Sequence, residues 1–382
     1  MLGKIAQIYD GPHATPEKTG DGPWYLSISS LVDGRLDLSQ SAHVSEEDFR
    51  IWTKRVKPEA GDVVFSYETR LGEAALVPDG LRCALGRRMG LLRPDTSRVD
   101  SQFLVYAYLG PEFQNTIHTR ISHGSTVNRI LLTELRDYPI RLPPLPEQRK
   151  IAEILGTWDE AIALTERRIK AARQRKKGMM QRLLTGRVRF PEFEGEEWQT
   201  VKLGEVFDER KERGYGDLPL LSVTAEAGIV YRDELDRRDT SSSDKSNYLR
   251  VCEGDVAYNT MRMWQGRSGV SEYEGIVSPA YTVCEPAPEI DVDFVGYLFQ
   301  LPSIIYRFRR YSQGMVSDTW TLRYDSFAAI AVQIPSLDEQ KRIADVLQTC
   351  DREIELLEQK RDALQRQKKG LMQRLLTGRV RV

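Results

Sequence analysis

The sequence lacks the features that mark several common protein classes. It has no run of about 18 apolar residues, which a membrane-spanning helix needs. Its start, Met1–Asp10, has no apolar stretch followed by small residues, so a secretory signal is not expected. The four cysteines, at 83, 252, 284 and 350, are far apart and form no CxxC or Cys/His ligand spacing. A zinc module and a disulfide scaffold are therefore not expected, and a reducing cytoplasm is the simplest location.

Motifs for catalysis are also missing. We find no GxxxxGK[ST] phosphate loop and no GxGxxG after a strand. The pair Pro143-Pro144 lacks the Asn or Asp and aromatic neighbours with which an amino-methyltransferase clamps a flipped base. His118 and His123 are close in sequence but have no third ligand pattern, so no metal site is predicted. These absences favour recognition over catalysis.

Charge is segregated along the chain. The net charge is −1, but Arg149–Arg189 holds 12 Lys and Arg against 4 Asp and Glu, a net of +8. Lys341–Arg381 holds 11 against 6, a net of +5, so the remaining residues carry −14. Charge counted by segment indicates more about partners than the average does.

The two basic segments are copies of each other at an offset of 192 residues. Of the 45 positions aligned from Leu145 and from Leu337, 25 are identical. The offset is about half the chain, so we read it as two tandem halves, each a variable block followed by a repeat unit. A duplicated helix without a function beyond folding is the plain alternative.

Each repeat unit predicts one long helix. Taken from Ile151 and from Ile343, every fourth and third position is apolar in eight of ten cases in both copies. A period of 3.5 residues is typical of a coiled-coil seam. Prolines precede both starts, and Gly186 and Gly378 follow as stops. Gly178 and Gly370 predict a bend or a close helix contact. The packing residues predicted for the spacer helices are Ile151, Leu155, Trp158, Ile162, Ile169, Ile343, Leu347, Ile354, Leu357 and Leu364.

The blocks are faintly related and read as α+β (mixed α/β), with more strand than helix. Gly61-Asp-Val-Val-Phe65 parallels Gly254-Asp-Val-Ala-Tyr258, and Phe103 and Tyr106 parallel Phe294 and Tyr297. Each block ends in a predicted apolar strand, at 138–143 and 331–335. Further strands are predicted at 63–67, 276–277 and 281–283, and helices at 45–55 and 292–300. We expect two globular domains with a shared skeleton, joined by two long antiparallel coiled-coil helices with pseudo-two-fold symmetry. The expected boundaries are 1–142, 143–189, 190–334 and 335–382.

This order of segments resembles the DNA specificity subunit (S subunit) of type I restriction–modification systems, over the whole chain. The motifs that carry the resemblance are Pro143-Pro-Leu-Pro-Glu-Gln148, Pro335-Ser-Leu-Asp-Glu-Gln340, the repeated ending Leu-Leu-Thr-Gly-Arg-Val-Arg, Asp10-Gly-Pro-His-Ala-Thr-Pro16, and Met261-Arg-Met-Trp-Gln-Gly266 with Gly275-Ile-Val-Ser-Pro-Ala-Tyr281. The first block has no clear copy of the last motif.

The resemblance implies a subunit without catalytic activity or cofactor of its own. Each block would be a target-recognition domain for one half of a bipartite site in double-stranded DNA, and the helices would set the unread spacer. Two modification subunits, which bind S-adenosylmethionine and methylate adenine at N6, would dock on the helices. Restriction subunits, which hydrolyse ATP, are further partners that the resemblance implies. No membrane partner is expected.

Base reading needs Arg, Lys, Asn, Gln, Ser or Thr side chains that reach groove edges. In the first block the candidates are His13, Thr15, Arg87, Arg88, Ser122, His123, Ser125, Asn128 and Arg129. In the second block they are Arg262, Gln265, Arg267, Ser317, Asp318, Trp320 and Arg323, with Arg307, Arg309 and Arg310 as expected phosphate contacts. For each residue, an ordinary solvated side chain is the alternative. Two other functions stay open: a coiled-coil scaffold, and a restriction endonuclease or methyltransferase that acts alone.

Overall fold

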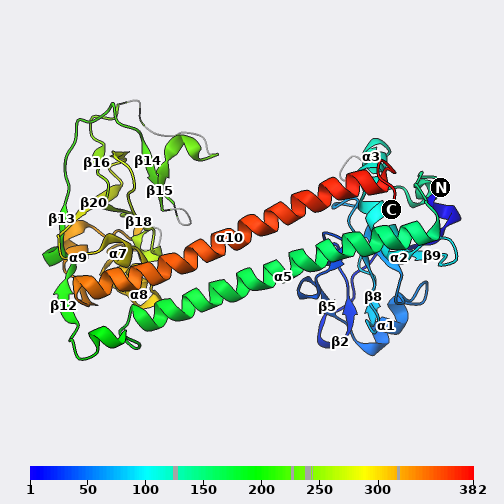
Figure 1. Cartoon of the computed structure of the whole chain (residues 1–382), viewed down its shortest axis with the longest axis horizontal. Coiled ribbons are helices and arrows are strands. Elements are labelled where there is room, and N and C mark those ends of the chain that lie inside the picture. The colour runs from blue at the N-terminus through cyan, green and yellow to red at the C-terminus, as the bar shows by residue number, and fades with distance from the viewer. Residues whose placement is uncertain (124–127, 225–227, 237–241, 243, 316–318) are drawn as a thin grey trace. The chain divides into compact units, whose positions relative to one another are not determined.

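The chain forms two compact units in a computed structural model that describes residues 1–123, 128–224, 228–236, 242, 244–315 and 319–382 (Figure 1). The first unit contains Met1–Glu166 and Gln359–Val382, and the second contains Arg167–Glu358. Both termini of this sequence therefore lie in the first unit. Among the helices that the structure describes, none is long and apolar enough to cross a membrane. The predicted boundaries of four segments stay a prediction, because each long helix contributes to both units.

A four-stranded antiparallel sheet is the centre of the first unit. Its strand order is β1-β9-β6-β7. These strands are Ala6–Asp10, Met89–Pro94, Val63–Ser66 and Ala74–Leu76. A three-stranded sheet, β5-β2-β8, lies in the same unit, at Ala42–His43, Thr19–Tyr25 and Cys83–Ala84. The remaining elements are the pairs β3 (Leu31–Val32) with β4 (Arg35–Leu36) and β10 (Ser122–His123) with β11 (Asn128–Arg129), and the helices α1 (Glu46–Trp52), α2 (Ser101–Leu109), α3 (Pro111–Thr119) and α4 (Leu132–Leu135).

The second unit repeats this plan. Its central sheet has the order β13-β20-β17-β18, at Phe207–Glu209, Tyr281–Pro286, Val256–Asn259 and Ser268–Val270. Three pairs accompany it: β14 (Leu221–Val223) with β15 (Ile229–Tyr231), β16 (Leu249–Val251) with β19 (Gly275–Val277), and β12 (Gln199–Lys202) with β21 (Ala331–Ile334). Its short helices are α6 (Leu203–Val206), α7 (Val292–Leu298), α8 (Pro302–Tyr311) and α9 (Tyr324–Ala328). The prediction of a shared skeleton is confirmed by the identical strand order.

The two repeat units are the long helices α5 (Leu145–Leu183) and α10 (Leu337–Leu376). Each begins two residues after a proline, as predicted, because the residue before a proline disfavours helical backbone. Gly186 and Gly378 follow the ends with φ of 65° and 69°, a left-handed conformation that glycine adopts without steric cost. The predicted glycine stops are therefore confirmed.

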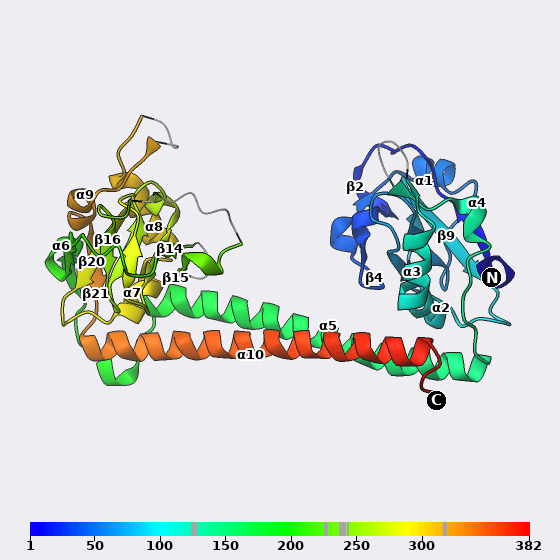
Figure 2. The same cartoon turned by 90° about the horizontal axis from the view of Figure 1, so that it is seen from above.

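The apolar stripes of α5 and α10 are buried within each unit. Ile151, Leu155, Ile162, Ile169, Ile343 and Leu347 are buried, and Trp158, Ile354, Leu357 and Leu364 are half-buried. In the first unit Ile151 and Leu155 share a core with Leu375, Phe103 and Leu2. In the second unit Ile343 and Leu347 share one with Leu183 and Phe294. Parts of both long helices therefore pack on each unit (Figures 1 and 2).

Within each unit the paired side chains of the two helices run in opposite directions. In the second unit Arg173 meets Glu358, Lys176 meets Asp351, and Met179 Sδ lies 3.7 Å from Cys350 Sγ. In the first unit Asp159 meets Lys368. In the second unit, later residues of α5 therefore pair with earlier residues of α10.

One prediction about local structure is wrong, and another is wrong in part. A Cβ added at Gly178 or Gly370 would meet no atom of another element within 4 Å, so neither glycine marks a close helix contact, and the alternative of a bend stays a prediction. Residues 138–143 form no strand, although the equivalent β21 does. Pro139 explains the difference, because it has no N–H to give to a ladder.

The predicted short helices are confirmed, with shorter ends. Helix α1 starts after Ser45, whose Oγ accepts from the Asp48 amide at 3.0 Å, as the predicted N-cap requires. Helix α7 covers 292–298, and Asp291 Oδ1 caps it by accepting from the Phe294 amide at 2.8 Å.

The Glu-Gln pair that opens each long helix fastens the helix to its unit. The buried Gln340 amide donates to Pro335 O and Glu289 O, at 3.0 and 3.2 Å, and its Oε1 accepts from the Asp291 amide at 3.0 Å. In the first unit Gln148 makes the same set of bonds, to Pro143 O, Arg98 O and the Asp100 amide. The glutamine therefore joins the start of a long helix to the N-terminus of α7 or α2.

The preceding glutamate binds the last arginine of the opposite repeat. Glu339 forms a two-point ion pair with Arg189, at 2.9 and 2.6 Å, and also accepts from Trp198 Nε1 at 3.2 Å. Glu147 forms the equivalent pair with Arg381, at 2.5 and 2.6 Å. The Glu-Gln pair and the last arginine are separated by the same number of residues in both repeats, so both ion pairs can form.

We expect Gln340→Ala to lower the free energy of unfolding by about 3 kcal/mol, because it leaves buried backbone groups without partners. Chemical denaturation of the full chain, followed by fluorescence, measures this loss. The control is Gln367→Ala on the exposed face of α10, which should change stability by less than about 0.5 kcal/mol. Equal effects of the two substitutions would contradict the role of Gln340.

The Glu147–Arg381 pair predicts a pH dependence. The hydrogen bond from Arg381 lowers the pKa of Glu147 below its ordinary value of 4.5. A carboxylate whose pKa is lowered by folding stabilises the folded state above its unfolded pKa, and this contribution is lost as the pH falls through the lower, folded value. The melting temperature of Arg381→Gln should therefore differ most from that of the unaltered chain at neutral pH. The difference should shrink below pH 4.5, and a constant difference would contradict the assignment.

Candidate nucleic-acid interface

The polar candidates of the first unit gather at one end of its central sheet. The register pairs Asp10 of β1 with Gly90, and Ser66 of β6 with Met89, so β1 and β6 end where β9 begins. Arg87 and Arg88 directly precede β9 at this end. The strand β11 lies at the same end of the sheet, because the Ile130 amide donates to Tyr67 O at 2.8 Å and the backbone of Arg129 forms a β-bridge with that of Glu68. We call this end of the sheet the first polar edge.

Two residues of the first polar edge have strained backbones. Thr69 and Arg88 both have a φ of 70°, where residues with a Cβ are uncommon. Their side chains meet, since Arg88 Nη1 donates to Thr69 Oγ1 at 2.9 Å, and Arg88 Nε lies 3.4 Å from Glu68. Strain of this kind persists where the surrounding structure enforces it, often at functional sites.

The other candidates of the first block are distributed around this edge. His13 is exposed and lies 2.9 Å from Asp10, which also accepts from Tyr67 Oη at 3.0 Å. Burial, then the charge of Asp10, raises the pKa of Tyr67, so its hydroxyl remains a donor. Thr15 and Arg87 are exposed. Asn128 and Arg129 lie on β11, opposite Ser122 and His123 of β10, and Ser125 lies outside the described residues.

The candidates of the second unit lie at the matching end of its sheet. Asn259 at the end of β17 pairs with Tyr281 at the start of β20, and Arg262, Gln265 and Arg267 follow β17. The segment at 319–323 is held beside them, because the Leu322 amide donates to Thr260 O at 2.8 Å. We call this end the second polar edge. It corresponds to the first by strand order.

A pair of tryptophans and an arginine form the centre of the second polar edge. The rings of Trp264 and Trp320 meet edge to face, with centroids 5.4 Å apart, and Trp264 Nε1 donates to Met261 O at 3.1 Å. The guanidinium of Arg309 lies over the Trp320 ring, 5.1 Å from its centroid. Both tryptophans are half-buried, so Trp264 belongs to this surface cluster and not to the core.

The remaining candidates differ in their contacts. Arg310 and Arg323 are exposed, on α8 and just before α9. Arg307 donates to the Ala331 carbonyl, so its guanidinium supports β21 of its own unit. Ser317 and Asp318 lie outside the described residues. The structure adds exposed apolar side chains that sequence reasoning missed: Tyr306, with 63% of its surface exposed, and Met315, with 98%. Helical periodicity on α8 could have found Tyr306, which is on the face opposite the buried Ile304 and Phe308.

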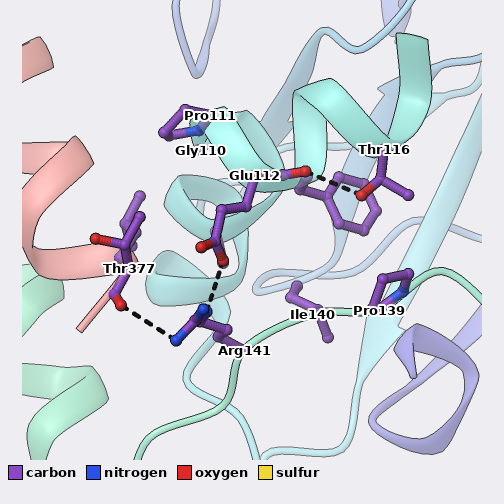
Figure 3. A pocket seen from close by; sticks show the side chains of 11 residues that line it. Gly110, Pro111, Glu112, Thr116, Pro139, Ile140, Arg141 and Thr377 are labelled. Carbon is purple, nitrogen blue, oxygen red and sulfur yellow. Dashed lines mark hydrogen bonds and ion pairs between the residues drawn. The ribbon is translucent and has the colours of Figure 1, made fainter. Parts of the chain in front are cut away.

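A pocket in the first unit is separate from this edge (Figure 3). It has a volume of about 300 Å³ and lies among α3, residues 139–141 and the end of α10. In Figure 3, Arg141 bridges two elements: it donates to Glu112 Oε2 at 2.7 Å and to Thr377 O at 3.2 Å. The pocket lining shares no described residue with the first polar edge, and its arginine is already paired.

Each unit thus presents one polar edge with arginines at the same end of a duplicated sheet, an arrangement that fits a tandem DNA-recognition protein. A family model for the type I restriction modification DNA specificity domain matches residues 25–174 and 195–366, once in each half. The chain belongs to this family.

Similar proteins and structures agree with this assignment. The chain is 27% identical to the putative type I restriction enzyme MjaX specificity subunit of Methanocaldococcus jannaschii, over 98% of this chain and 91% of that protein. It is 25% identical to the MjaVIII specificity subunit of the same organism, over 94% and 86%.

Among solved structures, the HsdS subunit from Thermoanaerobacter tengcongensis matches with a TM-score of 0.50 and 19% identity, over 99% of this chain and 96% of that one. The type I restriction–modification S subunit from M. genitalium matches with a TM-score of 0.58 and 16% identity, over 98% and 94%. A chain from work on complex assembly and conformational transition of the type I R-M system has a TM-score of 0.57 and 18% identity, over 98% and 96%. These structures show that the fold is shared.

Proposed function

We propose that the chain is the sequence-recognition subunit of a type I restriction–modification complex, and that each unit reads one half of a bipartite DNA site. The observation that carries this proposal is the match between the two polar edges. The first edge lies where β6 ends and β9 begins, and the second lies where β17 ends and β20 begins. These strands hold the same places in their sheets, yet the two edges carry different side chains. A shared skeleton with different reading groups is what two unequal half-sites require.

The chemistry of each edge suits a groove of DNA. Arginine binds guanine through O6 and N7 as a bidentate donor, and Asn or Gln binds adenine through N6 and N7. In the first unit Arg87, Asn128 and Arg129 would supply such groups, and in the second unit Arg262, Gln265 and Arg267 would. Arg88 contacts Thr69 and Glu68 and so supports the first polar edge. Arg309, whose guanidinium lies over Trp320, would bind a phosphate, because the stacked ring limits the freedom that the arginine loses on binding.

We infer that α5 and α10 form an antiparallel coiled coil with pseudo-two-fold symmetry that sets the spacer. The support is the apolar stripe, the opposed pairing within each unit, and the repeated Glu-Gln and Arg contacts. The chain itself would have no catalytic role and no cofactor. S-adenosylmethionine and ATP would bind to modification and restriction subunits.

We propose that two modification subunits dock at two exposed leucines of the long helices. Of the described large apolar residues of α5 and α10, Leu164 and Leu356 are exposed, with 45% and 65% of their surfaces accessible. They are equivalent in the repeat, 192 residues apart. An exposed leucine at the same place in both copies is expected if two copies of one partner bind equivalent surfaces.

The test of the function is methylation mapping by long-read sequencing, in cells that express a matching modification subunit with and without this chain. We expect a new two-part motif with methylated adenine only when the chain is present. Arg262→Ala should relax the bases of one half-site and leave the other half unchanged, because it removes reading groups from one unit only. A stable complex that produces no new motif would favour a scaffold, and methylation or cleavage by the purified chain alone would favour an independent enzyme.

The docking surface has its own test. We expect Leu356→Asp to weaken binding of one modification subunit by about tenfold or more, because it places a charge in an apolar contact. Leu164→Asp should do the same, and the double variant should abolish the complex in size-exclusion chromatography with light scattering. The control is Ile51→Asp, on an exposed apolar residue of α1 with 49% of its surface accessible. Wild-type affinity in the double variant would overturn this placement.

A further inference from the structure

A polar cluster joins each recognition block to both long helices. In the first unit the Tyr106 hydroxyl of α2 donates to Asp159 Oδ2 of α5 at 2.6 Å. Lys368 of α10 donates to Asp159 Oδ1 at 2.7 Å, and its ammonium group lies over the Tyr106 ring, 5.3 Å from the centroid. One side chain from each of three elements therefore meets at one point.

The second unit repeats this cluster with equivalent residues. The Tyr297 hydroxyl of α7 donates to Asp351 Oδ2 of α10 at 2.7 Å. Lys176 of α5 donates to both oxygens of Asp351, at 2.5 and 2.7 Å, and lies 4.9 Å from the centroid of the Tyr297 ring. The aspartates and the lysines are each 192 residues apart, but α5 and α10 exchange roles between the units.

The lysines occupy positions where packing alone would favour an apolar residue. Both fall at the eighth position of the apolar stripe, and both are largely buried, with 12% and 18% of the side chain exposed. Asp159 is largely buried too, with 16% of its side chain exposed, whereas Asp351 is 44% exposed. An ion pair that buries a lysine gives little net stability compared with apolar residues of the same size. Its retention in both copies therefore points to a geometric role, since hydrogen bonds and ion pairs depend on direction and apolar contacts do not.

The surroundings of Asp159 agree with this role. The hairpin β3–β4 and the two helices leave a hollow of about 560 Å³, lined by Arg35, Asp159 and Lys368 among others. Apolar packing does not fill this part of the joint, so polar contacts have to hold it. Burial, and then the bond to Asp159, raises the pKa of Tyr106, and burial and Asp351 do the same for Tyr297. Both tyrosines therefore stay protonated and donate.

We propose that Tyr106, Asp159 and Lys368, and likewise Tyr297, Asp351 and Lys176, are positioning residues that fix the direction of each recognition unit on its helices and so restrict the complex to one spacer length. The inference rests on the proposed function. The polar edges read the bases, and these clusters determine how far each edge can tilt along the DNA. Loss of one directional bond should widen the range of spacers without changing the bases that are read.

The two units should respond unequally. Asp159 also accepts from Arg35 of β4, at 3.1 Å, so the first cluster keeps a bond to its recognition block when Tyr106 loses its hydroxyl. In the second cluster Asp351 accepts from Tyr297 of its block and from Lys176 of α5. Tyr297→Phe should therefore have the larger effect, and Tyr106→Phe with Arg35→Gln should match it.

The experiment is methylation mapping of the complete complex, with each variant compared in the same host. For Tyr297→Phe we expect the methylated fraction of sites with a spacer one base pair longer or shorter to rise about tenfold, the change that one lost hydrogen bond to a charged group allows. The bases of both half-sites should stay the same. The matched control is Tyr215→Phe, which removes an exposed tyrosine–carboxylate bond of the same unit, between Tyr215 and Glu212 at 3.3 Å.

The outcomes separate the two proposals. If the unaltered chain produces no bipartite motif, the proposed function fails. If it does, and Tyr297→Phe changes only the amount of methylation while the spacer stays single, the residue is merely structural and the positioning role is overturned. The melting temperature and the amount of purified complex are measured for each variant, so that partial unfolding is recognised. Adding a change at Tyr215 to Tyr297→Phe is not expected to restore the selectivity for one spacer length.

Discussion

The architecture depends on one constraint: a long helix with an apolar stripe on one side cannot stay in water alone. Each stripe here is covered by the other helix and by a recognition block. The cores show this directly, because Ile151 and Leu375 share one core with α2, and Ile343 and Leu183 share another with α7. Burial of these side chains supplies the driving force, at about 25 cal/mol for each Å² of apolar surface. Burial does not fix the direction of a recognition block on its helices, whereas polar contacts do.

The repeated sequence motifs therefore correspond to specific joints. In the Glu-Gln pair the glutamate forms an ion pair with the last arginine of the other repeat. The glutamine joins the helix start to a recognition block through hydrogen bonds. These two joints, with the tyrosine–aspartate–lysine cluster, attach each block at several points along the helices. A block can then vary its exposed loops freely, since the residues that attach it lie elsewhere. This separation explains how most side chains of the two blocks differ while the strand order stays the same.

Much of this was predictable from local pattern. The long helices follow from the 3.5-residue period and the flanking prolines and glycines, and the N-cap of α1 from Ser45. The strand expected at 138–143 was wrong because Pro139 outweighs the apolar neighbours. The polar edges could be predicted only as scattered candidates, because strand register, and not sequence distance, brings Arg88 to Thr69 and Leu322 to Thr260. Lys176 and Lys368 interrupt the apolar stripe, and local pattern gives no reason for them. Each lysine shares its aspartate with a tyrosine that lies 53 or 54 residues from that aspartate in the sequence.

The division of the chain between the two units has a consequence for biosynthesis. The second unit is continuous, from Arg167 to Glu358, whereas the first needs Gln359–Val382 to complete its core. Chains are made from the N-terminus, and domains generally fold as units as they emerge. The block that is translated first must therefore wait, with an incomplete core around Phe103 and Ile151, until the second unit has been made. A ribosome that stops soon after Glu358 releases a chain with one finished unit and one open core. An open core of this kind exposes the apolar surface that chaperones and proteases recognise.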